Sequence, residues 1–294
     1  LGAARFREEV EAEWQACRAG APLLTAAELE RVRAHFRPPP YAALVDRDVT
    51  TGAEPRFAAW YRYNTHAHRV PGYRAVFVSL KAHGANPGDA TAEQMEAVAG
   101  LADRASFGLV RSTHDQNLML ADVRQDELFA VWRELERHSL ATPNIGTLTD
   151  MIACPGLDFC SLANAGTLGV ARDIQQRFDD LDYLYDLGHI AIRMSGCMNA
   201  CGHHHIGHIG ILGVDKRGEE WYQISLGGSA DGRTALGEVI GPSVPRQEVA
   251  ATIERIVELY RLRRTGGERF IDTVRRLGLE PFRSAAYALH PQAA

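Results

Sequence analysis

The chain has 294 residues, which is enough to bury a substantial core and to form two domains. Its hydrophobic fraction of 46% and charged fraction of 23% are typical of a soluble globular protein. A formal net charge of −5 argues against nucleic-acid binding, and no apolar run approaches the ~20 residues of a membrane span. We therefore expect a cytoplasmic protein that binds neither nucleic acid nor membranes.

Residues 1–55 are expected to form a helical arm and connector. An apolar stripe at spacings of three and four predicts a helix over residues 3–17, with members Phe6, Val10, Trp14 and Cys17. Cys17 is interpreted as a small buried hydrophobic residue. A capping box that begins at Thr25 predicts a second helix over residues 25–35, which ends before a run of prolines. We expect this arm to pack against a surface other than its own.

Residues 56–144 have the element order of a ferredoxin-like half-domain. Runs of β-forming residues and amphipathic patterns predict the order strand, helix, strand, strand, helix. The strands are expected at residues 73–81, 109–113 and 117–123, and the helices at residues 91–104 and 125–138. This order is typical of a split β-α-β fold and places the chain in the α+β class.

Two short motifs hold four of the five cysteines. Cys154 and Cys160 are separated by five residues, and Cys197 and Cys201 are separated by three. Thiolates grouped in this way suit a tetrahedral metal site or an iron–sulfur cluster. Zinc sites usually have two residues between paired cysteines, so the wider gaps favour a four-iron cluster. Zinc, a disulfide and a coincidental grouping remain alternatives at this point.

Residues 145–294 are expected to form an α/β domain that presents the cysteine motifs. A buried strand at residues 189–195 delivers Cys197 at its end, which is where open α/β sheets place their ligands. Helices are expected at residues 165–178, 247–262 and 268–276, and the tail shows no helical period.

A run of histidines follows the last cysteine of the second motif. Its members are His203, His204, His205 and His208. They could bind zinc or a haem iron, but we interpret them as side chains that pack beside a metal centre and hydrogen-bond to it. Asn199, between the second pair of cysteines, is interpreted as a further hydrogen-bond donor to the same centre.

The residues around both motifs extend the pattern. Residues 150–164 read Asp-Met-Ile-Ala-Cys-Pro-Gly-Leu-Asp-Phe-Cys-Ser-Leu-Ala-Asn, and residues 195–205 read Ser-Gly-Cys-Met-Asn-Ala-Cys-Gly-His-His-His. Both stretches resemble the sulfite and nitrite reductase hemoproteins, in particular their assimilatory bacterial branch. The resemblance implies that all four cysteines bind a 4Fe-4S cluster. It also implies siroheme as a second cofactor, with Cys201 as the catalytic residue that bridges the cluster to the siroheme iron.

The resemblance also implies a fold and a reaction. The fold is a ferredoxin-like half-domain followed by an α/β domain that binds siroheme and the 4Fe-4S cluster. The reaction is a six-electron reduction of sulfite to sulfide or of nitrite to ammonia. The implied partners are the sulfite or nitrite substrate and an electron donor, either ferredoxin or a flavoprotein reductase.

The resemblance covers about residues 56–285 and corresponds to the C-terminal half of a family member. Because the chain also begins with Leu, we expect a partial chain that is inactive without the N-terminal half. The segment from Arg111 to Gln116 resembles the later of two Arg-x-Thr-x-x-Gln motifs in the family. We expect these two residues to bond to local backbone instead of to a cofactor.

Two other functions remain open from the sequence. One is the related oxygenase of cobalamin biosynthesis, which resembles the family and carries a 4Fe-4S cluster without siroheme. The other is a non-catalytic iron–sulfur or zinc module. The histidine run and the match at residues 210–216 favour the reductase.

Overall fold

A computed structural model describes residues 2–20 and 24–288. The contacts within the chain divide it into two compact units, residues 1–42 and residues 43–294. The boundaries expected near residues 55 and 144 stay predictions. None of the helices in the described ranges has the length and hydropathy needed to cross a bilayer.

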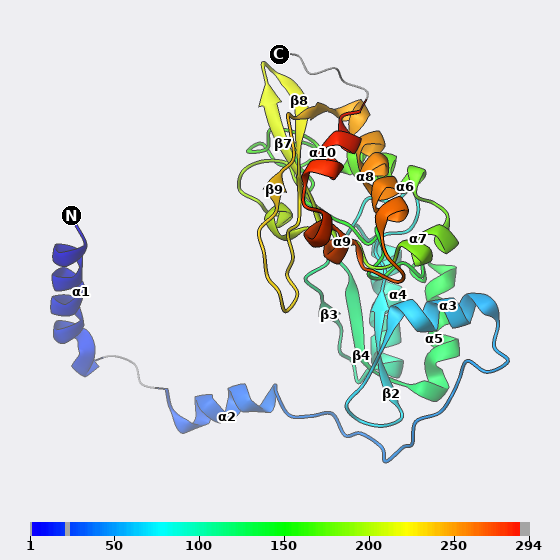
Figure 1. Ribbon diagram of the computed structural model, residues 1–294. Helices are drawn as coiled ribbons and strands as arrows, with labels where there is room; N and C mark the ends of the chain where they lie inside the picture. Colours follow the sequence, from blue (N-terminus) through cyan, green and yellow to red (C-terminus); the bar gives the residue numbers. More distant parts are fainter. Residues whose placement is uncertain (1, 21–23, 289–294) are drawn as a thin grey trace. The chain divides into compact units, whose positions relative to one another are not determined.

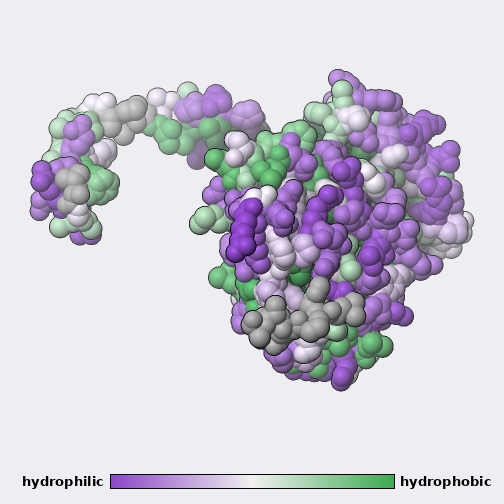
Figure 2. Space-filling model, turned by 90° about the horizontal axis from the view of Figure 1, so that it is seen from above, coloured by the Kyte–Doolittle hydropathy of each residue, from purple (hydrophilic) through white to green (hydrophobic). Residues whose placement is uncertain are grey.

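The first unit consists of short helices. They are α1 (Ala3–Cys17), the 3-10 turn η1 (Arg18–Gly20) and α2 (Ala26–Ala34). Thr25 caps α2 as predicted, because its side-chain oxygen accepts a hydrogen bond from the Glu28 amide at 3.1 Å. Neither α1 nor α2 has a buried residue, and hydrophobic surface is visible along this unit in Figure 2.

The prediction that Cys17 is buried is wrong. Cys17 is exposed, and Phe6, Val10 and Trp14 on the same stripe are at least half exposed. The helical period was read correctly, but a stripe is buried only where another element covers it. No described element of the first unit covers this one.

The second unit begins with a four-stranded antiparallel sheet in the order β1-β2-β4-β3 (Figure 1). Its strands are β1 (Thr65–Ala67), β2 (Tyr73–Val78), β3 (Arg111–Ser112) and β4 (Leu118–Arg124). Its helices are α3 (Pro55–Asn64), α4 (Ala92–Ala105), the 3-10 turn η2 (Gln125–Glu127) and α5 (Leu128–Arg137). The strands and helices expected here are all present, while α3 and β1 were not anticipated.

The helix α5 shows why this half-domain folds. Its buried side chains recur at helical spacing and are Leu128, Val131, Trp132 and Leu135. They form one core with Val76 of β2 and Leu120 of β4, which are opposite each other in the sheet. Each such side chain contributes about 1.5–3 kcal/mol by leaving water.

The second sheet follows in the order β10-β8-β7-β6-β5, with β9 paired to β8. Its strands are β5 (Ile152–Ala153), β6 (Ile192–Ser195), β7 (Ile209–Lys216), β8 (Glu219–Leu226), β9 (Glu238–Val239) and β10 (Val244–Pro245). The strands β5, β6 and β7 are parallel to one another, and β8 returns antiparallel to β7.

Helices pack against this sheet and enclose the larger core. They are α6 (Leu168–Arg177), α7 (Leu181–Leu187), the turns η3 (His204–Ile206) and η4 (Arg246–Glu248), α8 (Val249–Arg263), α9 (Phe270–Leu277) and α10 (Glu280–Ala286). The helices α6, α8 and α10 lie together beside β7 and β8 in Figure 1. Buried residues of α6, α8, β7 and β8 form one cluster.

Two boundaries in this half differ from the sequence prediction. The helix expected from residue 165 begins at Leu168, because the Ala165 carbonyl accepts from the Leu157 amide at 3.2 Å and the Ala165 amide bonds to the Gly196 carbonyl at 3.1 Å, which holds this residue in the loop. The tail was expected to lack a helix but contains α10, whose Phe282 is fully buried. A helix of 7 residues is too short to show a clear period in the sequence.

Replacing Trp132 with Ala is expected to lower the free energy of unfolding by about 3–5 kcal/mol, because Trp132 is 1% exposed within the half-domain core. Urea unfolding followed by far-ultraviolet circular dichroism measures this change. Trp14→Ala is the matched control, since Trp14 is 50% exposed on α1, and it should leave the main transition unchanged. Equal effects of the two substitutions would contradict this description of the core.

Candidate functional site

The two cysteine motifs leave the sheet from adjacent parallel strands. Cys154 directly follows β5, and Cys197 follows the end of β6 by two residues. The strands are in register, with Ala153 opposite Met194, and the Cys154 amide donates to the Met194 carbonyl at 3.1 Å. Parallel strands end at the same edge of a sheet, so the pairing brings both motifs together.

Small residues let the two cysteine loops touch through their backbones. Gly156 has a positive φ of 64°, and a Cβ there would lie 2.3 Å from the Ala165 carbonyl oxygen. A Cβ on Gly196 would lie 2.6 Å from the Gly156 Cα. The Asn164 amide also donates to the Gly196 carbonyl at 2.8 Å. No larger side chain fits at Gly156 or Gly196 without separating the loops.

The thiols of the two motifs differ in exposure. Cys197 is buried, Cys154 and Cys160 are partly buried, and Cys201 is exposed. All are free thiols, so the disulfide alternative is wrong. The Gly196 amide points at the Cys154 sulfur, with a nitrogen–sulfur distance of 3.5 Å. Amide donors of this kind stabilise negative charge on cluster sulfurs.

The donor set of four thiols in two pairs suits an iron–sulfur cluster. Within residues 2–20 and 24–288, no group of three or more His, Cys, Asp or Glu side chains is arranged to hold one metal ion. A zinc site needs four ligands converging on one centre at about 2.0–2.3 Å. A 4Fe-4S cluster binds each cysteine through a different iron, so its ligands do not converge on one point.

The histidine run is divided between two environments. His203 has a left-handed backbone, with φ of 54°, and leads into η3. His204 is 5% exposed, and its Nδ1 atom is buried with no hydrogen-bond partner among the described residues. Burial lowers its pKa to about 4. The His205 ring lies against it, with centroids 3.9 Å apart. His204 is therefore a neutral, buried side chain, while the predicted role of this run beside a metal centre stays a prediction.

His208 lies at the opposite edge of the sheet from the cysteines. It precedes β7, and its Nδ1 accepts a hydrogen bond from the Ala191 amide, just before β6, at 3.2 Å. This bond leaves the proton of the neutral ring on Nε2. Burial, with a smaller contribution from His189, lowers the pKa of His208 to about 4. His208 also lines a cavity of about 410 Å³ that includes Arg193.

The other residues singled out from the sequence have different positions. Asn199 is exposed, and its predicted donor role stays a prediction. Arg111 is exposed on β3. Gln116 bonds to backbone, but not to the local backbone that was expected: its amide group pairs with both the N–H and the C=O of Ala153, 37 residues away, at 2.9 and 3.0 Å.

Two family models match the two halves of the second unit. Residues 66–138 match the nitrite/sulfite reductase ferredoxin-like half domain, and residues 146–290 match the nitrite and sulphite reductase 4Fe-4S domain. The chain belongs to the nitrite and sulfite reductase family. The predicted family and α+β fold are thereby confirmed. The cofactors of this oxidoreductase family are those expected, a 4Fe-4S cluster and siroheme.

Several curated relatives share this region. The chain is 32% identical over 185 residues to a sulfite reductase (ferredoxin) 2 of Mycolicibacterium paratuberculosis, covering 59% of this chain and 33% of that protein. It is 33% identical over 193 residues to the assimilatory ferredoxin-dependent nitrite reductase of Haloferax mediterranei, covering 62% and 32%. The chain therefore spans about a third of the length of these relatives.

Solved structures show the same fold. The Mycobacterium tuberculosis NirA protein superposes with a TM-score of 0.58 at 27% identity, covering 72% of this chain and 39% of that one. A dissimilatory sulfite reductase I superposes with a TM-score of 0.60 at 14% identity, covering 76% and 72%, and at that identity shows the fold alone.

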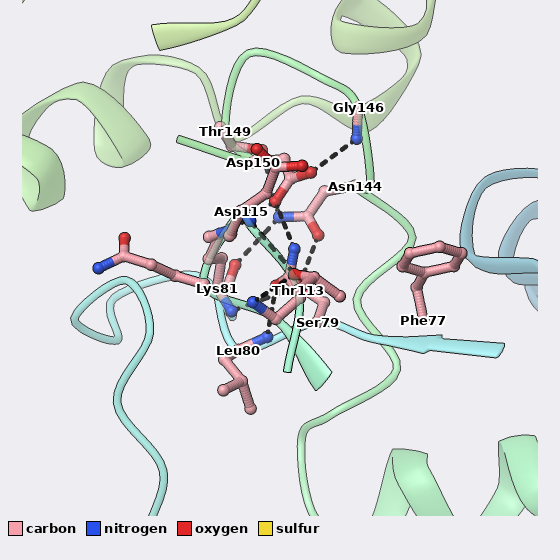
Figure 3. A network of polar contacts seen from close by, with 12 residues as sticks. Phe77, Ser79, Leu80, Lys81, Thr113, Asp115, Asn144, Gly146, Thr149 and Asp150 are labelled. Atoms are coloured by element: carbon pink, nitrogen blue, oxygen red, sulfur yellow. Dashed lines mark hydrogen bonds and ion pairs between the residues drawn. The ribbon is translucent and has the colours of Figure 1, made fainter. Parts of the chain in front are cut away.

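A buried ion pair joins the two halves of this reductase-family unit (Figure 3). The Lys81 side chain is fully buried, and its Nζ lies 2.6 Å from Asp150 Oδ1 and also donates to the Asp115 carbonyl. Asp150 accepts two more hydrogen bonds, from the Asn117 side chain at 2.9 Å and the Gly146 amide at 2.8 Å. Burial lowers the pKa of Lys81, while Asp150 opposes this shift.

Asn144 extends the network on the side of β2. Its Oδ1 accepts from the Ser79 hydroxyl at 2.7 Å, and its Nδ2 donates to the Lys81 carbonyl at 3.0 Å. Sequence reasoning missed these residues. Lys81 ends a predicted strand and Asp150 opens a motif, but no local pattern indicates that the two side chains meet 69 residues apart.

Replacing Lys81 with Met should destabilise the fold by about 3–5 kcal/mol, because the buried Asp150 carboxylate loses its counter-charge. The double substitution Lys81→Met with Asp150→Asn should recover part of that loss in urea unfolding. Lys216→Met is the control, since Lys216 is an exposed lysine over the Trp221 ring, and its effect should stay within about 0.5 kcal/mol. An effect of Lys81→Met no larger than the control would contradict the ion pair's role.

Because the pKa of His208 is lowered in the folded protein, we expect the protein to lose stability in weak acid. The folded pKa of His208 is about 4, against ~6.5 for an unfolded histidine, so the unfolded chain binds more protons between these values. Stability is therefore complete above pH ~6.5 and falls as the pH approaches about 4. Asp231 opposes the shift, while Arg269 and Arg275 add to it.

His208→Asn should flatten this dependence, because the Asn carbonyl can still accept the Ala191 amide but does not titrate. Thermal unfolding at a series of pH values measures the slope. The exposed His114 serves as control, and His114→Asn should retain the wild-type slope. An unchanged slope in His208→Asn would show that other groups determine the acid sensitivity.

Proposed function

We propose that this chain is the cluster-binding part of a sulfite or nitrite reductase. Cys154, Cys160, Cys197 and Cys201 would bind the 4Fe-4S cluster, and Cys201 would bridge it to the siroheme iron. The observation that carries this proposal is the parallel pairing of β5 and β6, which delivers both cysteine pairs to one edge of the sheet. The family match over residues 146–290 supports it.

The chain's own residues would hold and tune this centre. When bound, siroheme and the cluster would supply the electron transfer for a six-electron reduction of sulfite to sulfide or of nitrite to ammonia. Gly196 donates its amide to the Cys154 sulfur, which favours added negative charge at that ligand. Gly202 follows Cys201 tightly against β6, since a Cβ there would lie 1.8 Å from the Met194 carbonyl oxygen. Cys201 therefore stands on a closely held turn at the exposed end of the site.

An anionic substrate also needs basic side chains close to the reacting centre. The cations near the motifs in sequence are engaged elsewhere: Arg193 pairs with Asp115 at 3.0 Å, and Lys216 lies over Trp221. We therefore infer that a further polypeptide segment, homologous to this one, supplies them, as the expected N-terminal half. The comparisons agree with this inference, because the chain spans only about a third of the length of these relatives.

The remaining partners and the location are part of the same proposal. The two curated relatives described above are named a sulfite reductase and a nitrite reductase, and both names include ferredoxin. Another names NADPH, as expected where a flavoprotein reductase supplies the electrons. The donor would be ferredoxin or a flavoprotein reductase, and the location cytoplasmic. The names of these relatives favour a reductase over the cobalamin-biosynthesis oxygenase.

Anaerobically purified protein should contain about four iron atoms and four labile sulfides per chain and absorb in the visible range. Substituting Ala for any one of Cys154, Cys160, Cys197 or Cys201 should remove most of this iron and sulfide, because each holds one corner of the cluster. Cys17→Ser is the matched control and should retain all of it, since Cys17 lies in the other unit. Zinc in a colourless wild-type protein would overturn the proposal.

Adding the homologous N-terminal half tests whether that half supplies the basic side chains that the anionic substrate needs. Reductase activity with reduced methyl viologen should appear only in the combined sample. No gain over the isolated chain, with both cofactors present, would show that the missing basic residues come from elsewhere.

A further inference from the structure

The Gln116 side chain completes the outer edge of the strand that carries the first cysteine. In the part of the chain that the structure describes, β5 is the last strand of its sheet and pairs with β6 alone. On its free side, the Ala153 amide donates to Gln116 Oε1 at 2.9 Å, and the Ala153 carbonyl accepts from Gln116 Nε2 at 3.0 Å. One side chain thus replaces the two hydrogen bonds that a neighbouring strand would make.

The backbone groups of successive residues along β5 point to opposite sides of the strand, and this links the contact at Ala153 to Cys154. Ala153 directs its backbone groups outward to Gln116, whereas the next amide, that of Cys154, points inward and donates to the Met194 carbonyl at 3.1 Å. Gly196, two residues beyond Met194, in turn donates its amide to the Cys154 sulfur. The position of the first thiol relative to that amide therefore depends on how β5 is held.

The backbone of Gln116 is held in a defined turn. It has a left-handed backbone, with φ of 54°, inside a turn closed by the Thr113 amide bonding to the Asn117 carbonyl at 2.9 Å. Gly88 makes room for it, since a Cβ there would lie 3.2 Å from the Gln116 Cβ.

Both chain neighbours of Gln116 are anchored in the buried network. Asn117 donates to Asp150 at 2.9 Å, and the Asp115 carbonyl accepts from Lys81. A left-handed non-glycine residue persists only where its surroundings hold it, and here the turn and the network on both sides do so.

We propose that Gln116 is a positioning residue for Cys154: the ferredoxin-like half-domain holds β5 through the Ala153 backbone and so sets the amide–sulfur hydrogen bond from Gly196. This proposal rests on the proposed function, in which Cys154 binds the cluster. Gln116 does not touch the thiol, so its effect is on the geometry of the ligand and not on the chemistry. Because amide donors to sulfur favour the reduced cluster, a weakened Gly196 bond should lower the reduction potential.

Gln116→Met tests the proposal in the full chain, because Met has nearly the same shape but makes neither hydrogen bond. Native-state hydrogen exchange, resolved to single amides, should become about tenfold faster at both Ala153 and Cys154. In the cluster-loaded chain, a redox titration followed by electron paramagnetic resonance should give a more negative midpoint potential than wild type.

The control is Gln125→Met, which also removes a bridging amide in the same half-domain. Gln125 accepts from the Arg47 amide at 2.6 Å and donates to Asp46 at 3.0 Å, away from the cysteine strand. This variant should leave both the exchange at Cys154 and the midpoint potential as in wild type. If Gln116→Met fails to fold, Gln116→Glu takes its place, since a carboxylate keeps the bond from the Ala153 amide and loses only the other.

The outcomes separate the two proposals. Faster exchange at Ala153 alone, with Cys154 and the potential unchanged, would mean that Gln116 stabilises only its own contact, and positioning would be overturned. A wild-type chain that binds no cluster would refute the proposed function, while exchange at Cys154 would still decide whether Gln116 holds this strand.

Discussion

The site depends on one pair of parallel strands, β5 and β6. β5 has 2 residues, and its pairing with β6 is what brings two motifs 43 residues apart to one edge of the sheet. A strand this short contributes few hydrogen bonds of its own, so its position has to be set by what surrounds it. Gln116 on its outer side and the loop contacts around Gly156 and Gly196 supply those restraints.

The same requirement explains why the ferredoxin-like half-domain and the cysteine domain form one unit. The contact between them includes a buried ion pair, Lys81 with Asp150, that shares its hydrogen bonds with Asn117 and Asn144. A buried pair of this kind adds little stability compared with apolar packing, but its breakage leaves an uncompensated charge. Asp115 and Asn117, which flank Gln116, belong to the same network, so the turn carrying Gln116 is anchored where it meets β5.

The edges of the second sheet have separate roles. The cysteines occupy the edge where the parallel strands end, with Cys201 exposed and Cys197 buried. His208, at the edge where β6 and β7 begin, is a neutral core side chain held by the Ala191 amide. The chain returns from one edge to the other between Gly202, which packs against Met194 of β6, and His208, which precedes β7.

The sequence by itself determined the elements with a strong period and the residues with distinctive chemistry. The apolar positions of α5, the Thr25 cap and the four cysteines were all identified from local pattern, since each depends on residues close in the chain. The exposure of Cys17, the start of α6 at Leu168 and the contact of Gln116 with Ala153 were decided by tertiary structure. Cys17 is exposed because no described element of its unit covers it, and the other two features depend on partners far along the chain. A local sequence pattern does not identify such distant neighbours.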